Sequence, residues 1–313
     1  MRDVIVNFKE QIKEALGLGK GITLPKVERI VVSGMGGSGF AGDVLKSLFS
    51  DKDILVNKDY GLPRFINENA LVFIVSYSGN TEETLSSLEE ALKRQCSVVV
   101  ISSGGKCVEI AEKKKLPLVK VPSGIQPRSA LAYLLIPMLT VLEENEIIKN
   151  LNVYEAMQEI DMKELEEGGK ELAKHLYKHT PLIYSSENLK CLSYGWKTRL
   201  NENSKVHAFS NTIPEMNHNE IVGFTKKVGK FVAILIADRD DSRRNKLRFN
   251  ITKELIRKHG VEYFLIETNG YTLLSRIFKN LLLADFTSYY LALEYDVKPE
   301  PIKIVEDLKK ELM

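Results

Sequence analysis

The stretch Ser33-Gly34-Met35-Gly36-Gly37-Ser38-Gly39 directly follows the apolar run Arg29 to Ser33 and precedes a helical pattern. Short runs rich in Val and Ile that end in Gly or Ser and lead into a helix are typical of parallel strands with crossover helices. Three glycines of the stretch satisfy the pattern G-x-G-x-x-G. The strand followed by a helix predicts an α/β fold. The glycines between them could bind a dinucleotide, bind a small phosphate or merely form a tight turn, and these three interpretations stay open.

The same alternation of apolar runs and helical patterns continues along the chain and repeats in its second half. The predicted strands are Arg29 to Ser33, Ile54 to Asn57, Leu71 to Ser76, Ser97 to Ser102, Pro181 to Ser185, Phe231 to Asp238 and Val261 to Glu267. This repetition predicts two similar doubly wound α/β domains, each with a parallel sheet flanked by helices. We expect the N-terminal domain to cover residues 1–150 and the C-terminal domain residues 151–313.

Four helices are predicted outside this alternation. They are residues 1–16, the apolar run Ala130 to Leu142, the charged stretch Tyr154 to Lys178, and a final amphipathic helix after Pro299. The run Ala130 to Leu142 contains Pro137 and is too short to span a bilayer, so it is interpreted as a buried helix. The first residues interrupt their apolar side chains with charge, which indicates a helix and not a signal peptide.

Composition narrows the class of protein. The chain has 313 residues, of which 44% are hydrophobic and 27% charged. Its 44 basic and 42 acidic residues leave a net charge of +2, so we expect no nucleic-acid partner, although a local basic pocket for one small anion remains possible. The three cysteines form neither a disulfide framework nor a metal-binding spacing, which suits a reducing cytoplasm.

A second polar stretch, Ser76-Tyr77-Ser78-Gly79-Asn80-Thr81-Glu82-Glu83-Thr84, follows the predicted strand Leu71 to Ser76. Its small hydroxyls surround a turn that opens a helix. Hydroxyls beside free N–H groups at a positive helix end suit a phosphomonoester. The alternative is an ordinary N-cap by Asn80 or Thr81 with solvated serines. Glu82 and Glu83 suit the helix dipole but would repel a phosphate unless their side chains turn away from it.

Together the glycine stretch and the serine stretch resemble the sugar isomerase (SIS) domain, in which a serine-rich loop holds a sugar phosphate. Three further motifs are Pro127-Arg128-Ser129, Asn201-Glu202-Asn203-Ser204-Lys205 and Pro214-Glu215-Met216-Asn217-His218-Asn219-Glu220. In this order, and over nearly the whole chain, they resemble the archaeal and bacterial bifunctional phosphoglucose/phosphomannose isomerases. The resemblance implies two SIS domains and an enzyme that interconverts glucose 6-phosphate or mannose 6-phosphate with fructose 6-phosphate through an enediolate.

The resemblance also implies roles for particular residues. Glu202 corresponds to the base that moves a proton between C1 and C2, His218 to the ring-opening histidine, and Arg128 to the cation that stabilises the enediolate. Lys309 is the candidate for a C-terminal lysine, in competition with the lysines at 298, 303 and 310. The residues expected to bind the sugar phosphate are Gly36, Gly37, Ser38, Ser76, Ser78 and Thr81.

Each of these residues has a simpler interpretation when the family is set aside. Glu202 then reads as a solvated glutamate, Arg128 as a surface arginine at a helix start, and Lys309 as part of a polar helix face. Glu215 and His218 could also form half of a metal site, but a second Glu-x-x-His is absent from the sequence. The bifunctional family places a threonine near its lysine, whereas residues 299–307 contain none, which puts the mannose activity in more doubt than the glucose activity.

The resemblance further implies a homodimer with a shared site, in which the histidine comes from the neighbouring chain, and it implies no cofactor and no metal. Two rival functions remain. One is a non-catalytic SIS regulator that binds a phosphosugar. The other is a nicotinamide-dependent dehydrogenase, for which Asp59 would supply the acidic residue after the glycine pattern. An amidotransferase-linked synthase is excluded because the sequence has no N-terminal cysteine.

Overall fold

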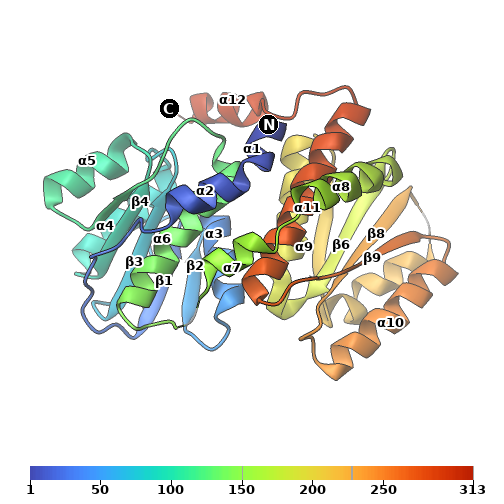
Figure 1. Cartoon of the computed structure of the whole chain (residues 1–313), viewed down its shortest axis with the longest axis horizontal. Coiled ribbons are helices and arrows are strands. Elements are labelled where there is room, and N and C mark those ends of the chain that lie inside the picture. Colours follow the sequence, from blue (N-terminus) through green and yellow to red (C-terminus); the bar gives the residue numbers. More distant parts are fainter. Residues whose placement is uncertain (150, 227, 313) are drawn as a thin grey trace. The chain divides into compact units, whose positions relative to one another are not determined.

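The computed structural model describes residues 1–149, 151–226 and 228–312. Contacts within it divide the chain into two compact units, Val6–Gln158 and Met1–Ile5 with Glu159–Met313 (Figure 1). We call them the first and the second unit. The boundary expected at residue 150 between two functional domains stays a prediction.

The first unit is built on one parallel sheet of five strands in the order β2-β1-β3-β4-β5. The strands are β1 (Arg29–Ser33), β2 (Ile54–Asn57), β3 (Ala70–Ser76), β4 (Ser97–Ser102) and β5 (Leu118–Lys120). This is the flavodoxin-like order of a doubly wound sheet, which has its topological switch point between β1 and β3. Ligands of such sheets bind beside the carboxyl ends of the strands at that point.

Helices cover both faces of this sheet (Figure 1). They are α2 (Phe8–Ala15), α3 (Gly36–Leu48), α4 (Glu82–Lys93), α5 (Gly105–Lys114), η1 (Pro127–Ser129), α6 (Leu131–Glu144) and α7 (Val153–Gln158). Val31 of β1 belongs to a buried cluster with Leu88 of α4 and Cys107 of α5. Its neighbour Val32 points to the other face, where it packs against Gly42 of α3. The alternation of side chains along β1 therefore separates the two helical layers.

The second unit repeats the same topology with one strand fewer. Its parallel sheet has the order β7-β6-β8-β9, with β6 (Thr180–Ser186), β7 (Phe209–Ile213), β8 (Phe231–Ala237) and β9 (Glu262–Glu267). The first strand of this unit, β6, has the second strand, β7, on one side and the third and fourth, β8 and β9, on the other. The first four strands of the first unit have the same order. The predicted class, two similar doubly wound α/β units, is confirmed.

The second sheet also carries helices on both faces. They are α8 (Met162–Leu176), η2 (Glu187–Leu189), α9 (Lys190–Asn203), η3 (Glu215–His218), η4 (Glu220–Thr225), α10 (Arg243–Lys258), α11 (Leu273–Glu294) and α12 (Lys303–Glu311), while α1 (Arg2–Val6) ends at the unit boundary. Phe249 and Ile256 of α10 pack on one face with Leu235 of β8. The helices α8 and α9 pack against α11.

All seven predicted strands are present in the described residues, which also contain two strands that were not predicted, β5 and β7. β7 reads Phe-Ser-Asn-Thr-Ile, which lacks a run of apolar residues because it is an edge strand paired only with β6. β5 has three residues and is also an edge strand. The stretch predicted as one charged helix is two, α7 and α8, because Asp161 caps a new helix by accepting from the N–H groups of Lys163 and Glu164.

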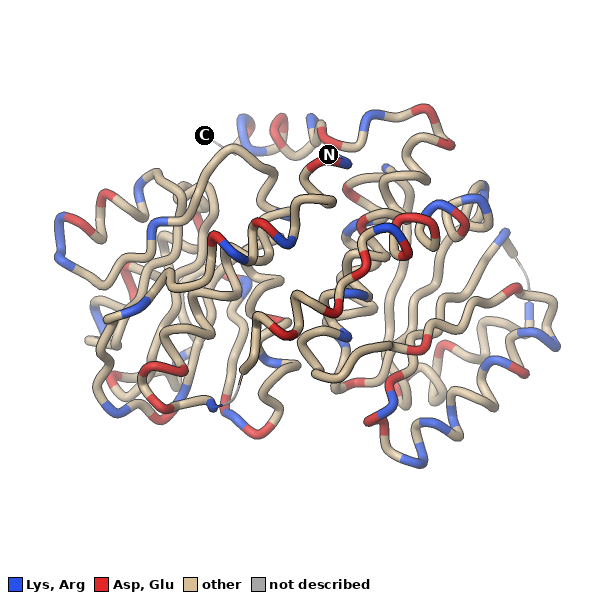
Figure 2. The backbone as a smooth tube through the Cα atoms, in the orientation of Figure 1, with Lys and Arg blue, Asp and Glu red and all other residues tan. Residues whose placement is uncertain are grey.

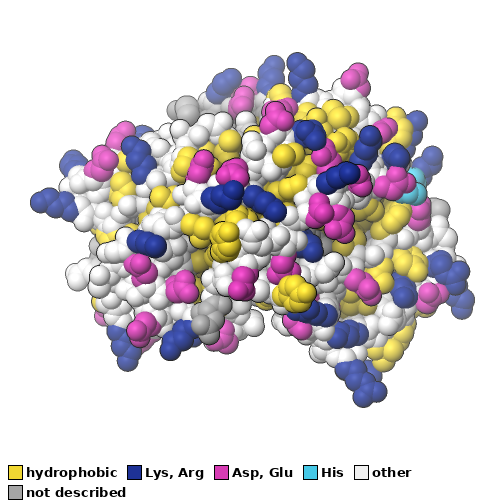
Figure 3. Space-filling model, viewed as in Figure 1, with side chains coloured by type: hydrophobic (Ala, Val, Ile, Leu, Met, Phe, Trp, Pro, Cys, Tyr) yellow, Lys and Arg dark blue, Asp and Glu magenta, His cyan; other side chains and the backbone are white. Residues whose placement is uncertain are grey.

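Charges of both signs are distributed along the backbone of both units (Figure 2) and alternate on the face drawn in Figure 3. Helix α10 departs from this balance, since it carries seven Lys and Arg residues and a single acidic one. Within the described part of the chain, no helix combines the length and the apolar character that a membrane span needs.

Two adjacent glycines of α8 test the packing of the second unit. A β-carbon on Gly169 would lie 2.5 Å from Cβ of Phe286 in α11, whereas one on Gly168 would meet only a methyl of Leu283 at 3.3 Å. We expect Gly169→Ala to lower the free energy of unfolding by about 1–3 kcal/mol through overpacking. Gly168→Ala is the matched control and should be neutral or stabilising, because alanine favours a helix interior.

Urea unfolding followed by the fluorescence of Trp196 measures both variants. This single tryptophan is fully buried in the second unit and therefore reports on it. Equal midpoints for the two variants would contradict the close α8–α11 contact.

Candidate functional site

Four loops leave the carboxyl edge of the first sheet next to the switch point. They are the glycine loop (residues 34–39) after β1, the serine loop (77–81) after β3, the loop 103–105 after β4, and the loop 121–129 after β5. Parallel strands end at the same edge, so the polar side chains of these loops gather there. The motifs that the sequence analysis singled out in residues 33–39, 76–84 and 127–129 therefore meet at one edge of one sheet.

The glycine loop leads into α3 with tight contacts to its neighbours. A β-carbon on Gly34 would lie 2.6 Å from the carbonyl oxygen of Val75, and one on Gly39 would lie 2.3 Å from that of Gly34. Gly36 has a φ of +50° and is exposed, with open space where a side chain would be. Gly34 and Gly39 therefore serve packing, while Gly36 leaves backbone accessible at the start of α3.

The hydroxyls of the predicted phosphate site divide into structural and accessible ones. Ser38 is buried, and its Oγ accepts from the N–H of Tyr77 at 3.1 Å, which joins the glycine loop to the serine loop. Ser76 is also buried; its Oγ accepts from the N–H of Gly79 and donates to Thr81 Oγ1, both at 3.1 Å. Ser78 is exposed and Thr81 is half-buried at the N-cap of α4. Ser78 and Thr81 are therefore the hydroxyls open to a ligand, whereas Ser38 and Ser76 shape the loops.

The third loop was missed by the sequence analysis. Ser103 donates its Oγ to the carbonyl oxygen of Tyr77 at 2.6 Å, and the N–H of Lys106 donates to Oδ1 of Asn80 at 3.0 Å. A β-carbon on Gly79 would lie 1.7 Å from the carbonyl oxygen of Gly104, so the two loops touch through their backbones. The signal was available, because Ser102-Ser103-Gly104-Gly105 follows a predicted strand as the other two motifs do.

Arg128 lies in η1, directly before the buried helix α6, and is half-buried. Pro127 precedes it and takes the first position of η1, and η1 packs against α3. The structure therefore brings Arg128 to the edge that carries the glycine and serine loops, within the same unit. The guanidinium is a permanent cation with several donors, which suits an anionic ligand.

Glu202 lies in the last turn of α9 in the second unit and is half-buried. The neighbouring asparagines hold the helix end: Asn203 donates to Ser288 Oγ at 2.9 Å, and Asn201 donates to the carbonyl oxygen of Val206 at 2.8 Å. A carboxylate at the negative end of a helix is electrostatically unfavourable. The position of Glu202 is therefore one that helix stability alone would not select.

Three contacts along α9 and α11 support this helix end. Trp196 donates to Asn280 at 2.8 Å, the buried Arg199 pairs with Asp285 at 2.7 Å, and Ser204 donates to the carbonyl oxygen of Ser288 at 2.7 Å. Trp196 and Arg199 lie in α9 and Ser204 directly follows it, while all three partners lie in α11. The last turn of α9 is thus held rigidly, and Glu202 with it.

His218 lies beyond the end of strand β7, whereas Glu202 lies before its start. The chain passes from Glu202 to the start of β7, runs along β7, and reaches η3, where His218 is exposed. At the rise of a strand, the five residues of β7 span about 13 Å. Asn217 fixes η3 by donating to Thr252 Oγ1 of α10 at 2.9 Å. The second unit therefore holds Glu202 and His218 at opposite edges of its sheet, and does not bring them together.

Lys309 lies on α12, whose residues are all exposed. The segment that leads to α12 is anchored near Glu202, because Lys205 Nζ donates to the carbonyl oxygens of both Glu202 and Pro299, the latter at 3.0 Å. The N-terminal amino group also pairs with Glu300, at 2.6 Å. The base of the C-terminal tail thus lies beside the end of α9, and Lys309 follows two turns into the helix.

The second sheet has a different carboxyl edge. Where the first unit has its serine loop after β3, the second has Asp238-Arg239-Asp240-Asp241 after β8. Asp238 is buried, accepts from Arg276 Nε at 2.7 Å and from the N–H of Asp240 at 2.8 Å, and also accepts from Thr268. Arg276 pairs with Asp240 as well. This edge satisfies its own charges and presents carboxylates, so it is unsuited to a phosphate.

Burial works against ionisation of Asp238, but the hydrogen bonds from Thr268, the Asp240 N–H and Arg276 outweigh it and lower its pKa. Asp241 shows the opposite result, because burial raises its pKa despite the N–H of Asp238 donating to it at 2.8 Å. Asp238 and Arg276 therefore form a buried ion pair that depends on both members.

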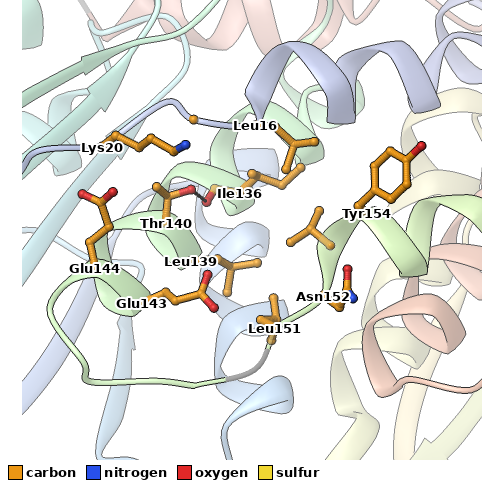
Figure 4. Close-up of a pocket in the computed structure, with 12 residues that line it drawn as sticks. Leu16, Lys20, Ile136, Leu139, Thr140, Glu143, Glu144, Leu151, Asn152 and Tyr154 are labelled. Atoms are coloured by element: carbon orange, nitrogen blue, oxygen red, sulfur yellow. Dashed lines mark hydrogen bonds between the residues drawn. The ribbon is translucent and has the colours of Figure 1, made fainter.

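A pocket of about 480 Å³ lies elsewhere in the first unit, between the end of α2, the second half of α6 and the start of α7 (Figure 4). Its wall is formed by Ile136, Leu139 and Leu151, and Lys20 and Glu143 also line it. None of the predicted site residues lines this pocket. Among the described residues, no group of three or more His, Cys, Asp or Glu side chains could hold a metal ion.

The two doubly wound units, one with a glycine and serine edge, define a protein with two SIS domains. Residues 23–116 match the family described as SIS domain, and residues 165–312 match the family described as bacterial phospho-glucose isomerase C-terminal SIS domain. The C-terminal domain of glucosamine-fructose-6-phosphate aminotransferase from Francisella tularensis has the same fold, with a TM-score of 0.73, 13% identity and coverage of 95% of this chain and 96% of that one.

Relatives that align with nearly the whole chain define a narrower family within the proteins with two SIS domains. A bifunctional phosphoglucose/phosphomannose isomerase from Caldicellulosiruptor bescii is 34% identical over 100% of this chain and 98% of its own length. One of the same description from Aquifex aeolicus is 39% identical over 90% of each chain. The chain belongs to the family of bifunctional phosphoglucose/phosphomannose isomerases and is therefore a member of a family of enzymes. A D-glucosamine-6-phosphate 4-epimerase from Sulfolobus acidocaldarius is also similar, at 30% identity over 99% of this chain and 97% of its own length.

The ion pair at the second carboxyl edge gives a stability prediction. Arg276→Ala leaves Asp238 buried without its cation and should lower the free energy of unfolding by about 3–5 kcal/mol. Arg257→Ala is the control, because Arg257 forms an exposed pair with Glu254 and should cost less than about 0.5 kcal/mol. Since the pKa of Asp238 is lower in the folded state, its stabilisation is present above the unfolded value of about 4 and is lost as the pH falls through the folded value.

Urea unfolding followed by Trp196 fluorescence between pH 7 and pH 3 measures both effects. A wild-type protein whose stability does not fall toward pH 3, or an Arg276→Ala variant as stable as Arg257→Ala, would contradict this account.

Proposed function

We propose that this chain interconverts glucose 6-phosphate or mannose 6-phosphate with fructose 6-phosphate, without a metal, through an enediolate. The observation that carries the proposal is the edge of the first sheet, where the exposed Ser78 and Gly36 and the half-buried Arg128 meet at the switch point. Membership of a family of phosphosugar isomerases supports the same substrate class.

In this proposal the phosphate lies at the start of α4. Ser78 and Thr81 donate their hydroxyls to phosphate oxygens, and backbone N–H groups at the positive ends of α3 and α4 add to them. Gly36 lets the ligand approach the backbone of the glycine loop. Ser38, Ser76 and Gly37 act indirectly by shaping the loops.

The chemistry moves one proton between adjacent carbons. His218 donates a proton to the ring oxygen while the C1 hydroxyl gives its proton to solvent water, which opens the ring to the aldehyde. The Glu202 carboxylate then takes the proton from C2, and the electron pair forms the enediolate, whose negative oxygen Arg128 stabilises. Glu202 returns the proton to C1, and the proton of the C2 hydroxyl passes to the negative oxygen on C1, which leaves a hydroxyl on C1 and the ketone at C2. Lys309 adds a second cation on the C-terminal tail.

The separation of Glu202 and His218 along β7 supports a site shared between two copies of the chain. One copy would supply Glu202 and its partner His218, as a symmetric dimer with two identical sites allows. The proposed assembly is a homodimer in the cytoplasm that binds a small sugar phosphate and no nucleic acid.

Glu202→Gln tests the base. The amide cannot accept the C2 proton, so turnover of fructose 6-phosphate should fall by at least about a thousandfold, while binding of the sugar phosphate stays nearly unchanged. Removing a carboxylate from the negative end of α9 should not lower the thermal midpoint. The assay contains EDTA and detects both aldose products.

Other results of this assay have distinct meanings. Substantial turnover by Glu202→Gln overturns the assignment of the base. Tight binding by the wild type without turnover indicates a phosphosugar regulator, and consumption of D-glucosamine 6-phosphate in place of fructose 6-phosphate indicates an epimerase like the Sulfolobus relative. Loss of wild-type turnover with EDTA contradicts the metal-free mechanism.

Mixing two inactive variants tests the shared site. We expect Glu202→Gln and His218→Asn to be inactive alone, and a mixture that exchanges subunits to recover about a quarter of wild-type activity, because half of the dimers are mixed and each has one intact site. Unmixed variants at the same total concentration are the control. No recovery after verified subunit exchange would place both residues of a site on one chain.

A further inference from the structure

We propose that Gly37 and Tyr77 are positioning residues that hold the loop 121–129, and with it Arg128, against the glycine and serine loops. This inference rests on the proposed function for the role of Arg128. Gly37 was expected to bind the substrate, but its surroundings point to another task. Tyr77 belongs to the serine motif and received no role from the sequence.

The contact at Gly37 is steric. A β-carbon on Gly37 would lie 2.5 Å from the carbonyl oxygen of Pro127 and 2.8 Å from Cα of Arg128. Real β-carbons do not approach backbone atoms so closely, and these two neighbours are backbone, which cannot rotate away. The missing side chain of Gly37 is thus the space in which the backbone of Pro127 and Arg128 lies.

The contact at Tyr77 is polar and acts on the preceding part of the same loop. Tyr77 is buried with its hydroxyl accepting from the N–H of Ile125 at 3.4 Å, three residues before Arg128. Its backbone is held on both sides, because its N–H donates to Ser38 Oγ and its carbonyl oxygen accepts from the N–H and the Oγ of Ser103. Tyr77 therefore links three carboxyl-edge loops directly to the fourth.

The other residues of this loop explain why it needs such support. Residues 122–124 are exposed, and Gly124 has a φ of +103° with open space around it. Tyr133, in the first turn of α6, donates its hydroxyl to Glu14 of α2 and so anchors the helix that follows Arg128. The loop is thus fixed after Arg128 by α6, while Tyr77 holds it at Ile125 and Gly37 adjoins the backbone of Pro127 and Arg128.

The consequence concerns which kinetic constant each residue controls. Ser78 touches the phosphate in the proposed site, so Ser78→Ala should weaken binding of inorganic phosphate by about tenfold. Tyr77→Phe and Gly37→Ala should leave that binding within about twofold. Both should instead lower kcat, because they displace the cation that stabilises the enediolate, Tyr77→Phe by about threefold to tenfold and Gly37→Ala by more.

A double-mutant cycle with Arg128→Ala separates positioning from general damage. If Tyr77 acts through Arg128, Tyr77→Phe should cost nothing further in the Arg128→Ala background. The matched controls are Tyr290→Phe, which removes a tyrosine hydroxyl bonded to Glu166 in the second unit, and Gly168→Ala in α8, where a β-carbon meets only a methyl of Leu283 at 3.3 Å. Neither control should change kcat. Multiplicative losses in the double variant would overturn the inference.

Hydrogen exchange gives a readout that does not need turnover. In Tyr77→Phe, the peptide that contains Ile125 should exchange at least about threefold faster, while peptides of β3 and α4 stay unchanged. If exchange at Ile125 is unchanged in Tyr77→Phe, the proposed role of Tyr77 is overturned, even if this variant turns over substrate slowly. Because the measurement uses Tyr77→Phe, it still tests the inference if Gly37→Ala fails to fold. A wild-type protein without isomerase turnover would defeat the proposed function, while the exchange experiment would still decide whether the loop is held in this way.

Discussion

The candidate site depends on a close approach between backbones that only glycine permits. Gly34 lies against the carbonyl of Val75, Gly37 against Pro127 and Gly79 against Gly104, at distances that leave no room for a β-carbon. The contacts of Gly37 and Gly79 join loops that follow different strands, and the contact of Gly34 joins the glycine loop to the end of β3. Because the loops touch through main chain, their geometry does not vary with side-chain rotamers. The hydroxyls of Ser78 and Thr81 and the cation of Arg128 are thereby presented from a rigid edge.

The two units show that the same sheet topology can support opposite electrostatics. At the edge of the first unit, helix starts and hydroxyls face outward and suit an anion. At the corresponding edge of the second, Asp238 and Arg276 neutralise one another in the interior and Asp240 extends the pair to the surface. The fold therefore provides the place for a ligand, and the side chains after the third strand of each unit decide whether an anion could be held there.

The second unit contributes in another way, through the ends of its elements. Packing against α11 and the contacts of Arg199, Asn203 and Ser204 hold the last turn of α9 and place Glu202 at a helix end where a carboxylate is unfavourable. The length of β7 then separates Glu202 from His218. A reaction that needs both therefore draws them from different chains in the proposed mechanism.

The sequence alone predicted seven of the nine strands found in the described residues, together with the repeat of the two units and the SIS motifs. Buried parallel strands carry continuous apolar runs, and their turns need Gly and Ser. The edge strands β5 and β7 were not predicted, since an edge strand needs no such run. Sequence also proposed Ser38, Ser76 and Gly37 as residues that bind the sugar phosphate, which stays a prediction. Only the tertiary structure showed that Ser38 and Gly37 contact neighbouring loops and that Ser76 forms hydrogen bonds within its own loop. Spacing along the chain records which residues are near in sequence, whereas contacts between loops after different strands depend on how the sheet orders those strands.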